Sequence, residues 1–223
     1  MGDGPGIAVV KLGGSYAGSA ELKSWLNALT ACAGHVVLVP GGGPFADTVR
    51  DAQRSMGFDD RAAHHMALIA MEQYGYALTS LGRRLARAAS LAAIRRALGA
   101  GKVPVWSPTR MVLAAADVPC SWDVTADSLA AWLAGRLGAK QVLLVKQIRP
   151  PGPSISARDL VARGLVDPEF PAFLEASGAA ASVAGPADHA QAAAAIRSGS
   201  PCGIRIQDQA PLVSNQRPLA PDS

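Results

Sequence analysis

The sequence contains few cysteines, few lysines and no long hydrophobic run. Its three cysteines, Cys32, Cys120 and Cys202, show no CxxC spacing, which argues against a zinc site or a disulfide framework. No stretch approaches the length of a membrane span, and no charged-then-apolar leader precedes the first apolar segment. We therefore expect a cytoplasmic protein with reduced thiols and no membrane partner.

Aromatic residues are also scarce, at 5% of the chain, and this bears on its most basic segment. That segment contains Arg83, Arg84, Arg87, Arg95 and Arg96. No aromatic platform or nucleic-acid-binding motif accompanies these arginines, so we expect a solvated helix surface and no nucleic acid partner. The net charge of +4 is small and suits an anionic small molecule.

The length and composition indicate a globular protein with a substantial core. The chain has 223 residues, of which 49% are hydrophobic and 17% charged. This length fits one domain, which we place at residues 1–206. From residue 207 the chain is polar and rich in proline, and we expect residues 207–223 to be a mobile tail.

The most informative segment lies near the N-terminus. A short apolar run, Ile7-Ala8-Val9-Val10, predicts a buried strand, and it is followed by Lys11, Gly13, Gly14 and Ser15. A strand, a glycine turn and a helix in succession gather backbone N–H groups into a hollow that can hold phosphate. Lys11 would place an ammonium beside it. The alternative is a simple tight turn with an exposed lysine.

A second strand–glycine unit follows within about thirty residues, which suits βαβ construction. His35-Val36-Val37-Leu38-Val39 is apolar throughout, as in a parallel sheet covered by helices on both faces. It leads into Gly41, Gly42 and Gly43, and then into a helix that begins at Pro44 and ends before Gly57. Three glycines let a ligand approach the backbone next to the positive end of that helix.

A third unit combines a carboxylate with a second lysine. Thr125 is a good N-cap for a helix that ends at Gly138, and Asp127 lies in its first turn. The apolar strand 141–145 then ends at Lys146. Asp127 either stabilises the helix start, worth about 0.3–1 kcal/mol, or faces the glycine loops and holds a lysine.

The remaining pattern predicts further elements of both kinds. A long helix is expected over residues 61–87, with His64 and His65 in its first turns as either packing residues or substrate contacts. Proline within the strand at 103–106 indicates either a place at the sheet edge or a position among the first residues of the strand. We also expect a short strand at 111–113, a loop over 147–160, partly helical structure over 160–174, strands at 181–184 and 202–206, and a helix over 188–197.

Three segments stand in an order that resembles the amino-acid kinase superfamily, which includes aspartate, acetylglutamate, uridylate and isopentenyl phosphate kinases. They are Lys11-Leu-Gly-Gly-Ser, Gly41-Gly-Gly-Pro-Phe-Ala-Asp, and Asp123-Val-Thr-Ala-Asp with its helix and strand. The resemblance spans residues 7 to about 206. It implies an α/β fold, a three-layer αβα sandwich with a mainly parallel sheet, and a kinase that forms a homo-oligomer.

The resemblance also implies roles for individual residues. Lys11 and Lys146 would contact phosphoryl groups, with Arg149 as an alternative to Lys146, and Asp127 would organise the lysine ammonium. ATP and Mg²⁺ are the implied cofactors, with no protein metal site. The implied binding residues are Gly13, Gly14 and Ser15 for the nucleotide phosphates, and Gly41, Gly42, Gly43, His64, Asp123 and Thr125 for the substrate.

Within the superfamily, residues 64–75 and Val166-Asp167-Pro168 are most similar to a small branch that phosphorylates an aminomethylfuran-methyl phosphate during methanofuran synthesis. The chain departs from the family at residues 146–151, where most members grip the nucleoside. The function we expect is transfer of the γ-phosphoryl group of ATP to such an anionic acceptor. The alternatives are a uridylate or carboxylate kinase, and a non-catalytic nucleotide-binding or anion-binding regulatory protein.

Overall fold

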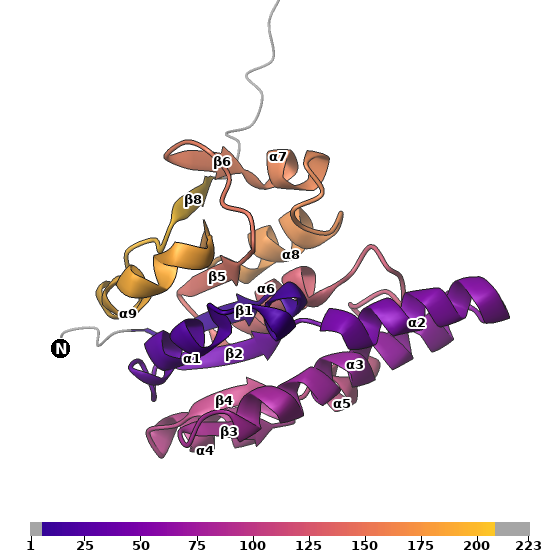
Figure 1. Cartoon of the computed structure of the whole chain (residues 1–223), viewed down its shortest axis with the longest axis horizontal. Helices are drawn as coiled ribbons and strands as arrows, with labels where there is room; N and C mark the ends of the chain where they lie inside the picture. The colour runs from indigo at the N-terminus through magenta and orange to yellow at the C-terminus, as the bar shows by residue number, and fades with distance from the viewer. Residues whose placement is uncertain (1–5, 208–223) are drawn as a thin grey trace, which may run out of the picture.

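The computed structural model describes residues 6–207, which form one eight-stranded sheet with helices on both faces (Figure 1). The strands are β1 Ala8–Leu12, β2 Val36–Pro40, β3 Leu85–Ala88, β4 Val103–Trp106, β5 Gln141–Val145, β6 Ser154–Ser156, β7 Ala180–Ala184 and β8 Ile204–Gln207. The α-helices are α1 Leu22–Thr30, α2 Gly43–Met56, α3 Asp60–Ser80, α4 Leu91–Gly99, α5 Thr109–Leu113, α6 Ala126–Leu137, α7 Ala157–Ala162, α8 Phe170–Ser177 and α9 His189–Ser198.

The sheet confirms the predicted α/β architecture with a mainly parallel sheet. The strand order is β3-β4-β2-β1-β5-β7-β8-β6, and only the β7–β8 pair is antiparallel. One core packs α4, α6 and α8 against the sheet, and the other packs α1 and α9 against its opposite face. β1 lies between β2 and β5. The chain runs from β1 to β2 on one side of β1 and later returns to β5 on its other side, so the direction of strand addition changes at β1. Ligands of open α/β sheets bind beyond the carboxyl ends of strands at such a point.

Side-chain alternation places both predicted lysines on the α6 face of the sheet. Along β1, Val10 and Leu12 point into the core that contains α1 and α9. Val9 points into the opposite core, which contains α6, and Lys11 lies on the same face of the sheet as Val9. Along β5, Leu144 belongs to the α6 core. Lys146, two residues further, therefore points to that face as well.

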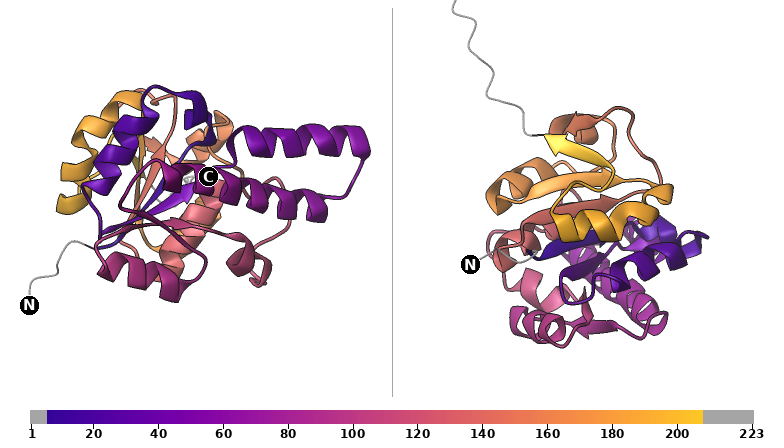
Figure 2. Two further views of the ribbon diagram at one scale, coloured as in Figure 1. Left: turned by 60° about the horizontal axis from the view of Figure 1, so that its bottom comes forward. Right: turned by 90° about the vertical axis from the view of Figure 1, so that its left-hand side faces the viewer.

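Helices α2 and α3 lie side by side and project beyond the end of the sheet (Figures 1 and 2). α2 has Pro44 in its first turn and ends at Gly57, whose left-handed φ of 74° suits glycine. α6 begins after Thr125, whose side chain accepts a hydrogen bond from the Asp127 amide, and ends at Gly138 with φ of 66°. These helix limits agree with the sequence predictions.

Other sequence predictions were wrong. The helix expected over 61–87 ends at Ser80, and residues 85–88 form the edge strand β3. The strand expected at 111–113 belongs to helix α5, and the loop expected over 147–160 contains β6 and the start of α7. β4 lies between β3 and β2, so its proline does not mark the edge of the sheet; Pro104 is the second residue of the strand, which was the alternative.

Within residues 6–207, none of the helices combines the length and the apolar character needed to cross a membrane. The predicted mobile tail, apart from residue 207, lies outside the described residues. The assignment of residues 1–206 to a single domain stays a prediction.

Candidate active site

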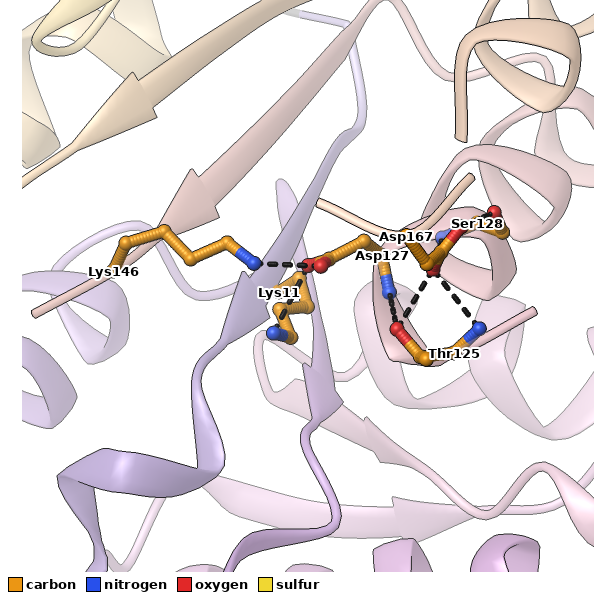
Figure 3. Close-up of polar contacts among 6 residues, drawn as sticks. All are labelled: Lys11, Thr125, Asp127, Ser128, Lys146 and Asp167. Carbon is orange, nitrogen blue, oxygen red and sulfur yellow. Dashed lines mark hydrogen bonds and ion pairs between the residues drawn. The ribbon is translucent and has the colours of Figure 1, made fainter. Parts of the chain in front are cut away.

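Three charged side chains meet where β1, β5 and the N-terminus of α6 come together (Figure 3). The Nζ atom of Lys11 lies 2.9 Å from Oδ1 of Asp127, and Nζ of Lys146 donates a hydrogen bond of 2.6 Å to Oδ2 of the same carboxylate. The side chain of Asp127 is only 5% exposed. One carboxylate is therefore shared by two ammonium groups, and the cluster carries a net charge of +1 when all three groups are ionised.

The ionisation of this cluster reflects burial and mutual attraction. Burial favours a raised pKa for Asp127, but the two lysines outweigh burial and hold the pKa below its usual range. Burial lowers the pKa of Lys146 to about 8; Asp127 opposes this shift and the nearby Lys11 adds to it. Lys146 therefore begins to lose its charge just above neutral pH.

A second carboxylate, Asp167, fixes the start of α6 and with it the position of Asp127 (Figure 3). Asp167 is buried and accepts hydrogen bonds from the Thr125 amide at 2.9 Å and from Thr125 Oγ1 at 2.7 Å. It also accepts from the amide of Ser128 at 3.1 Å and from the Ser128 hydroxyl. The free N–H groups of a helix start are satisfied here by an acceptor from the segment between α7 and α8.

Tyr16 supports the second lysine from the other side of the sheet. Its hydroxyl donates a hydrogen bond of 2.9 Å to the backbone oxygen of Lys146, directly after β5. Tyr16 is fully buried, and burial raises the pKa of its hydroxyl to about 12. The phenol therefore stays a hydrogen-bond donor and fixes the backbone that carries Lys146.

The two glycine loops pack backbone against backbone beside these charges. A Cβ atom on Gly14 would lie 2.1 Å from the amide nitrogen of Gly43, and one on Gly41 would lie 2.5 Å from the amide nitrogen of Gly14. Gly43 also has a left-handed φ of 57°. No larger residue fits at this contact, which lies at the N-terminus of α2, where backbone N–H groups favour an anion.

A cavity of about 490 Å³ opens at this contact. It brings together eight of the predicted site residues: Lys11, Gly14, Ser15, Gly41, Gly42, Gly43, His64 and Thr125. Asp127 and Lys146 do not line the cavity, but Asp127 pairs with Lys11, which does. Arg50 and Trp122 also line the cavity, and the sequence analysis did not single them out.

Three predicted residues lie elsewhere. The amide of Gly13 donates to the backbone oxygen of Val145 at 3.1 Å, so it is occupied within the sheet. Asp123 is exposed and hydrogen-bonded to Ser121, and it does not line the cavity. Arg149 pairs with Asp188 at 3.2 Å, which leaves Lys146 as the second cation of the cluster.

Comparisons with known proteins agree with this architecture. The sequence profile of the amino acid kinase family matches residues 6–149. A curated relative, the (5-(aminomethyl)furan-3-yl)methyl phosphate kinase of Methanocaldococcus jannaschii, is 26% identical over 178 residues, which cover 75% of this chain and 82% of the relative.

Solved structures show the same fold. The uridylate kinase of Archaeoglobus fulgidus superimposes with a TM-score of 0.68 at 18% identity, over 90% of this chain and all of that one. The aspartate kinase of Synechocystis has a TM-score of 0.64 at 13% identity, over 91% of this chain and 40% of its own. With the profile match covering more than half of its length, the chain belongs to the amino acid kinase family and is a kinase.

Proposed function

We propose that the protein transfers the γ-phosphoryl group of ATP to the phosphate of a small phosphate monoester, such as an aminomethylfuran-methyl phosphate. The observation that carries the proposal is the Lys11–Asp127–Lys146 cluster beside two glycine loops that meet at one cavity. The relative that acts on a phosphate monoester supports the choice of acceptor, and 82% of its length is matched.

The chemistry requires little more than this arrangement. Phosphoryl transfer passes through a loose transition state whose charge is spread over the transferred oxygens, so catalysis depends on alignment and electrostatic stabilisation. Lys11 would stabilise the transferred group, and Lys146 would contact a neighbouring phosphate oxygen. An acceptor that is already a phosphate anion needs no general base.

The nucleotide phosphates would lie on the amides of Gly14 and Ser15, and the acceptor phosphate on the loop formed by Gly41, Gly42 and Gly43. No group of three or more His, Cys, Asp or Glu side chains that could hold a metal ion occurs in residues 6–207. Asp127 is already engaged by two lysines. Mg²⁺ would therefore be held mainly by the nucleotide phosphates, where it neutralises part of their charge.

The proposal includes the cellular setting of the reaction. We place the enzyme in the cytoplasm, as a homo-oligomer, in the synthesis of a methanofuran-type one-carbon cofactor. Cys32, Cys120 and Cys202 are all unpaired in the described structure, as expected for a reducing compartment.

An acceptor panel tests the proposal directly. The purified protein is incubated with Mg²⁺ and ATP and with aminomethylfuran-methyl phosphate, UMP, aspartate or acetylglutamate, and ADP release is measured. We expect ADP release with the furan phosphate. Preference for UMP or for a carboxylate would replace the proposed acceptor. Stabilisation by MgATP with no ADP released for any acceptor would favour a regulatory nucleotide-binding protein.

A further inference from the structure

Helix α2 carries two matched ion pairs, and they differ in their relation to the cavity. Arg50 pairs with Asp47 at 2.9 Å. Arg54, one turn further along the helix, pairs with Asp51 in the same i,i+3 arrangement. The first pair lines the cavity and the second does not. Arg50 is also the less exposed arginine, with 43% of its side chain accessible against 72% for Arg54, so the two pairs have different surroundings.

The guanidinium of Arg50 also lies over an aromatic ring. Its central carbon is 4.5 Å from the ring centroid of Trp122, which lines the cavity as well. The indole is itself held in place, because its Nε1 atom donates a hydrogen bond of 2.7 Å to Oε1 of Gln53 on α2. Both groups that hold the guanidinium, Asp47 and Trp122, border the cavity. The positive charge of Arg50 therefore lies at the cavity and not on the outer surface of α2.

The part of the chain that the structure describes leaves most N–H donors of Arg50 available to a ligand. A guanidinium has five N–H donors in one plane, and packing over an aromatic ring occupies only the face of that plane. Within residues 6–207, the side chain donates one hydrogen bond, from Nη1 to Oδ1 of Asp47. The side chain of Asp47 is 71% exposed, and such a surface pair contributes little to stability. A phosphate dianion can therefore share the guanidinium with Asp47 or replace it.

The proposed reaction brings more negative charge into the cavity than the lysine cluster balances. The Lys11–Asp127–Lys146 cluster has a net charge of +1, whereas ATP and a phosphate monoester together carry several negative charges. Mg²⁺ neutralises part of the charge of the nucleotide. The acceptor phosphate would rest on backbone N–H groups of the glycine loop at the N-terminus of α2, and a cation close to that loop would stabilise it. Arg50 lies about two turns into the same helix.

We propose that Arg50 binds the phosphate of the acceptor and aligns it for attack on the γ-phosphoryl group. This inference rests on the proposed function, because it concerns the same cavity and reaction. An oxygen of the acceptor phosphate forms a bond to the γ-phosphorus while the bond from that phosphorus to the bridging oxygen breaks, so ADP leaves and a diphosphate ester forms. Arg50 takes up no proton and only holds the attacking group. Trp122 orients the guanidinium, and Asp47 holds it when no phosphate is bound.

The test compares the two matched arginines of α2. The variants are Arg50→Ala, Arg50→Lys and, as the control, Arg54→Ala, which removes the same charge from the same helix outside the cavity. KM for aminomethylfuran-methyl phosphate, KM for ATP and kcat are measured for the unaltered enzyme and for each variant. Both arginines are at least partly exposed, so the substitutions should leave the fold intact, which circular dichroism checks.

Arg50→Ala should raise KM for the acceptor by about tenfold to a hundredfold, the range for hydrogen bonds to a charged group, and leave KM for ATP unchanged. It should also lower kcat, because the attacking phosphate is less well aligned. Arg50→Lys should recover only part of the loss, because an ammonium lacks the planar set of donors that binds two oxygens at once. Arg54→Ala should match the unaltered enzyme in all three constants.

Three results would overturn the inference while leaving the proposed function intact. They are an unchanged KM for the acceptor in Arg50→Ala, an equally large rise in KM for ATP, and an equal rise in KM for the acceptor in Arg54→Ala, which would indicate a general effect of surface charge. If Arg50→Ala does not fold, the same comparisons are made with Arg50→Lys. Absence of ADP release by the unaltered enzyme with every phosphate monoester would overturn the proposed function together with the inference.

Discussion

One carboxylate, Asp127, serves two ammonium groups, and this imbalance controls how the site responds to anions and to pH. With Lys11 at 2.9 Å and Lys146 at 2.6 Å, one positive charge remains uncompensated in a buried setting. A phosphate oxygen entering the cavity supplies the missing negative charge. The same imbalance acts on Lys146, because burial and the nearby Lys11 both lower its pKa and the shared Asp127 opposes them only in part.

The pKa of Lys146 predicts an alkaline limit to activity. Because its pKa is lowered to about 8 from the ordinary 10.5, kcat/KM should fall about tenfold per pH unit above that value if the charge is required. Lys146→Arg keeps its charge throughout this range and should remove the limit. A limit that stays near pH 8 in Lys146→Arg would show that another group causes it.

The effect of Lys146 on stability has the opposite sign. Between about pH 8 and 10.5, the unfolded chain keeps the proton that the folded chain has lost. Where the unfolded state binds more protons, the free energy of unfolding rises with pH. The contribution of Lys146 to stability should therefore increase over the window in which activity declines, and denaturant titrations of the unaltered protein and Lys146→Arg would show the difference.

The charged residues of the cluster could be predicted from sequence, but the residue that orients them could not. Lys11, Asp127 and Lys146 follow apolar strands or start a helix, so local pattern and alternation indicated where they lie. Asp167 lies 39 and 42 residues from its partners Ser128 and Thr125, and nothing in the local pattern links it to α6. The sequence marks Asp167 only as part of Val166-Asp167-Pro168, a segment that resembles one branch of the family.

At the scale of elements, the start of α6 depends on a carboxylate from another segment. Asp167→Ala would remove the acceptor of four hydrogen bonds. Because each unpaired buried donor costs about 1–3 kcal/mol, we expect the free energy of unfolding to fall by about 3 kcal/mol or more, together with kcat. Thermal unfolding and steady-state kinetics measure both quantities.

Two variants serve as comparisons for Asp167→Ala. Asp167→Asn keeps an acceptor oxygen and should lose less stability. Asp159→Ala, which changes an exposed carboxylate in α7, should have little effect. Equal stability of Asp167→Ala and the unaltered protein would refute the orienting role.

The contact between the glycine loops predicts a second effect at this scale. In Gly14→Ala, the new Cβ would meet the backbone of Gly43 at 2.1 Å, so the loops must separate. Misplacing reacting groups by about an ångström lowers turnover by about a hundredfold, which is the loss we expect. Gly99→Ala is the control, because its Cβ meets nothing within 4 Å. Full activity in Gly14→Ala would show that the contact does not position the phosphates.

Elements with strong periodicity or caps were predictable, and short elements at the sheet margin were not. The buried strands β1, β2 and β5 are mostly apolar, and Thr125 and Gly138 mark the limits of α6. β3 reads Leu-Ala-Arg-Ala, without β-branched residues, and it follows a helix, so the sequence pattern extended that helix through it. β3 is a strand because β4 pairs with it, which is a tertiary cause.

At the scale of the whole molecule, the two cores share the strands that separate them. β1 gives alternate side chains to each core, so neither core can form without the central sheet. We therefore predict that residues 1–206 unfold in one cooperative step. Trp25 lies in one core and Trp106 in the other, so tryptophan fluorescence and far-UV circular dichroism should give the same midpoint. Two separate midpoints would contradict the single-domain hypothesis.

The central claim is that Lys11, held by Asp127 beside the glycine loops, stabilises a phosphoryl group during transfer to a phosphate acceptor. The most direct measurement follows γ-labelled ATP with aminomethylfuran-methyl phosphate, using the unaltered enzyme, Lys11→Ala and the exposed control Lys23→Ala. We predict that the label enters a diphosphate product, that Lys11→Ala transfers it roughly a hundredfold more slowly or worse, and that Lys23→Ala matches the unaltered enzyme. Transfer at the full rate by Lys11→Ala, or label that never leaves ATP with any phosphate acceptor, would contradict the account.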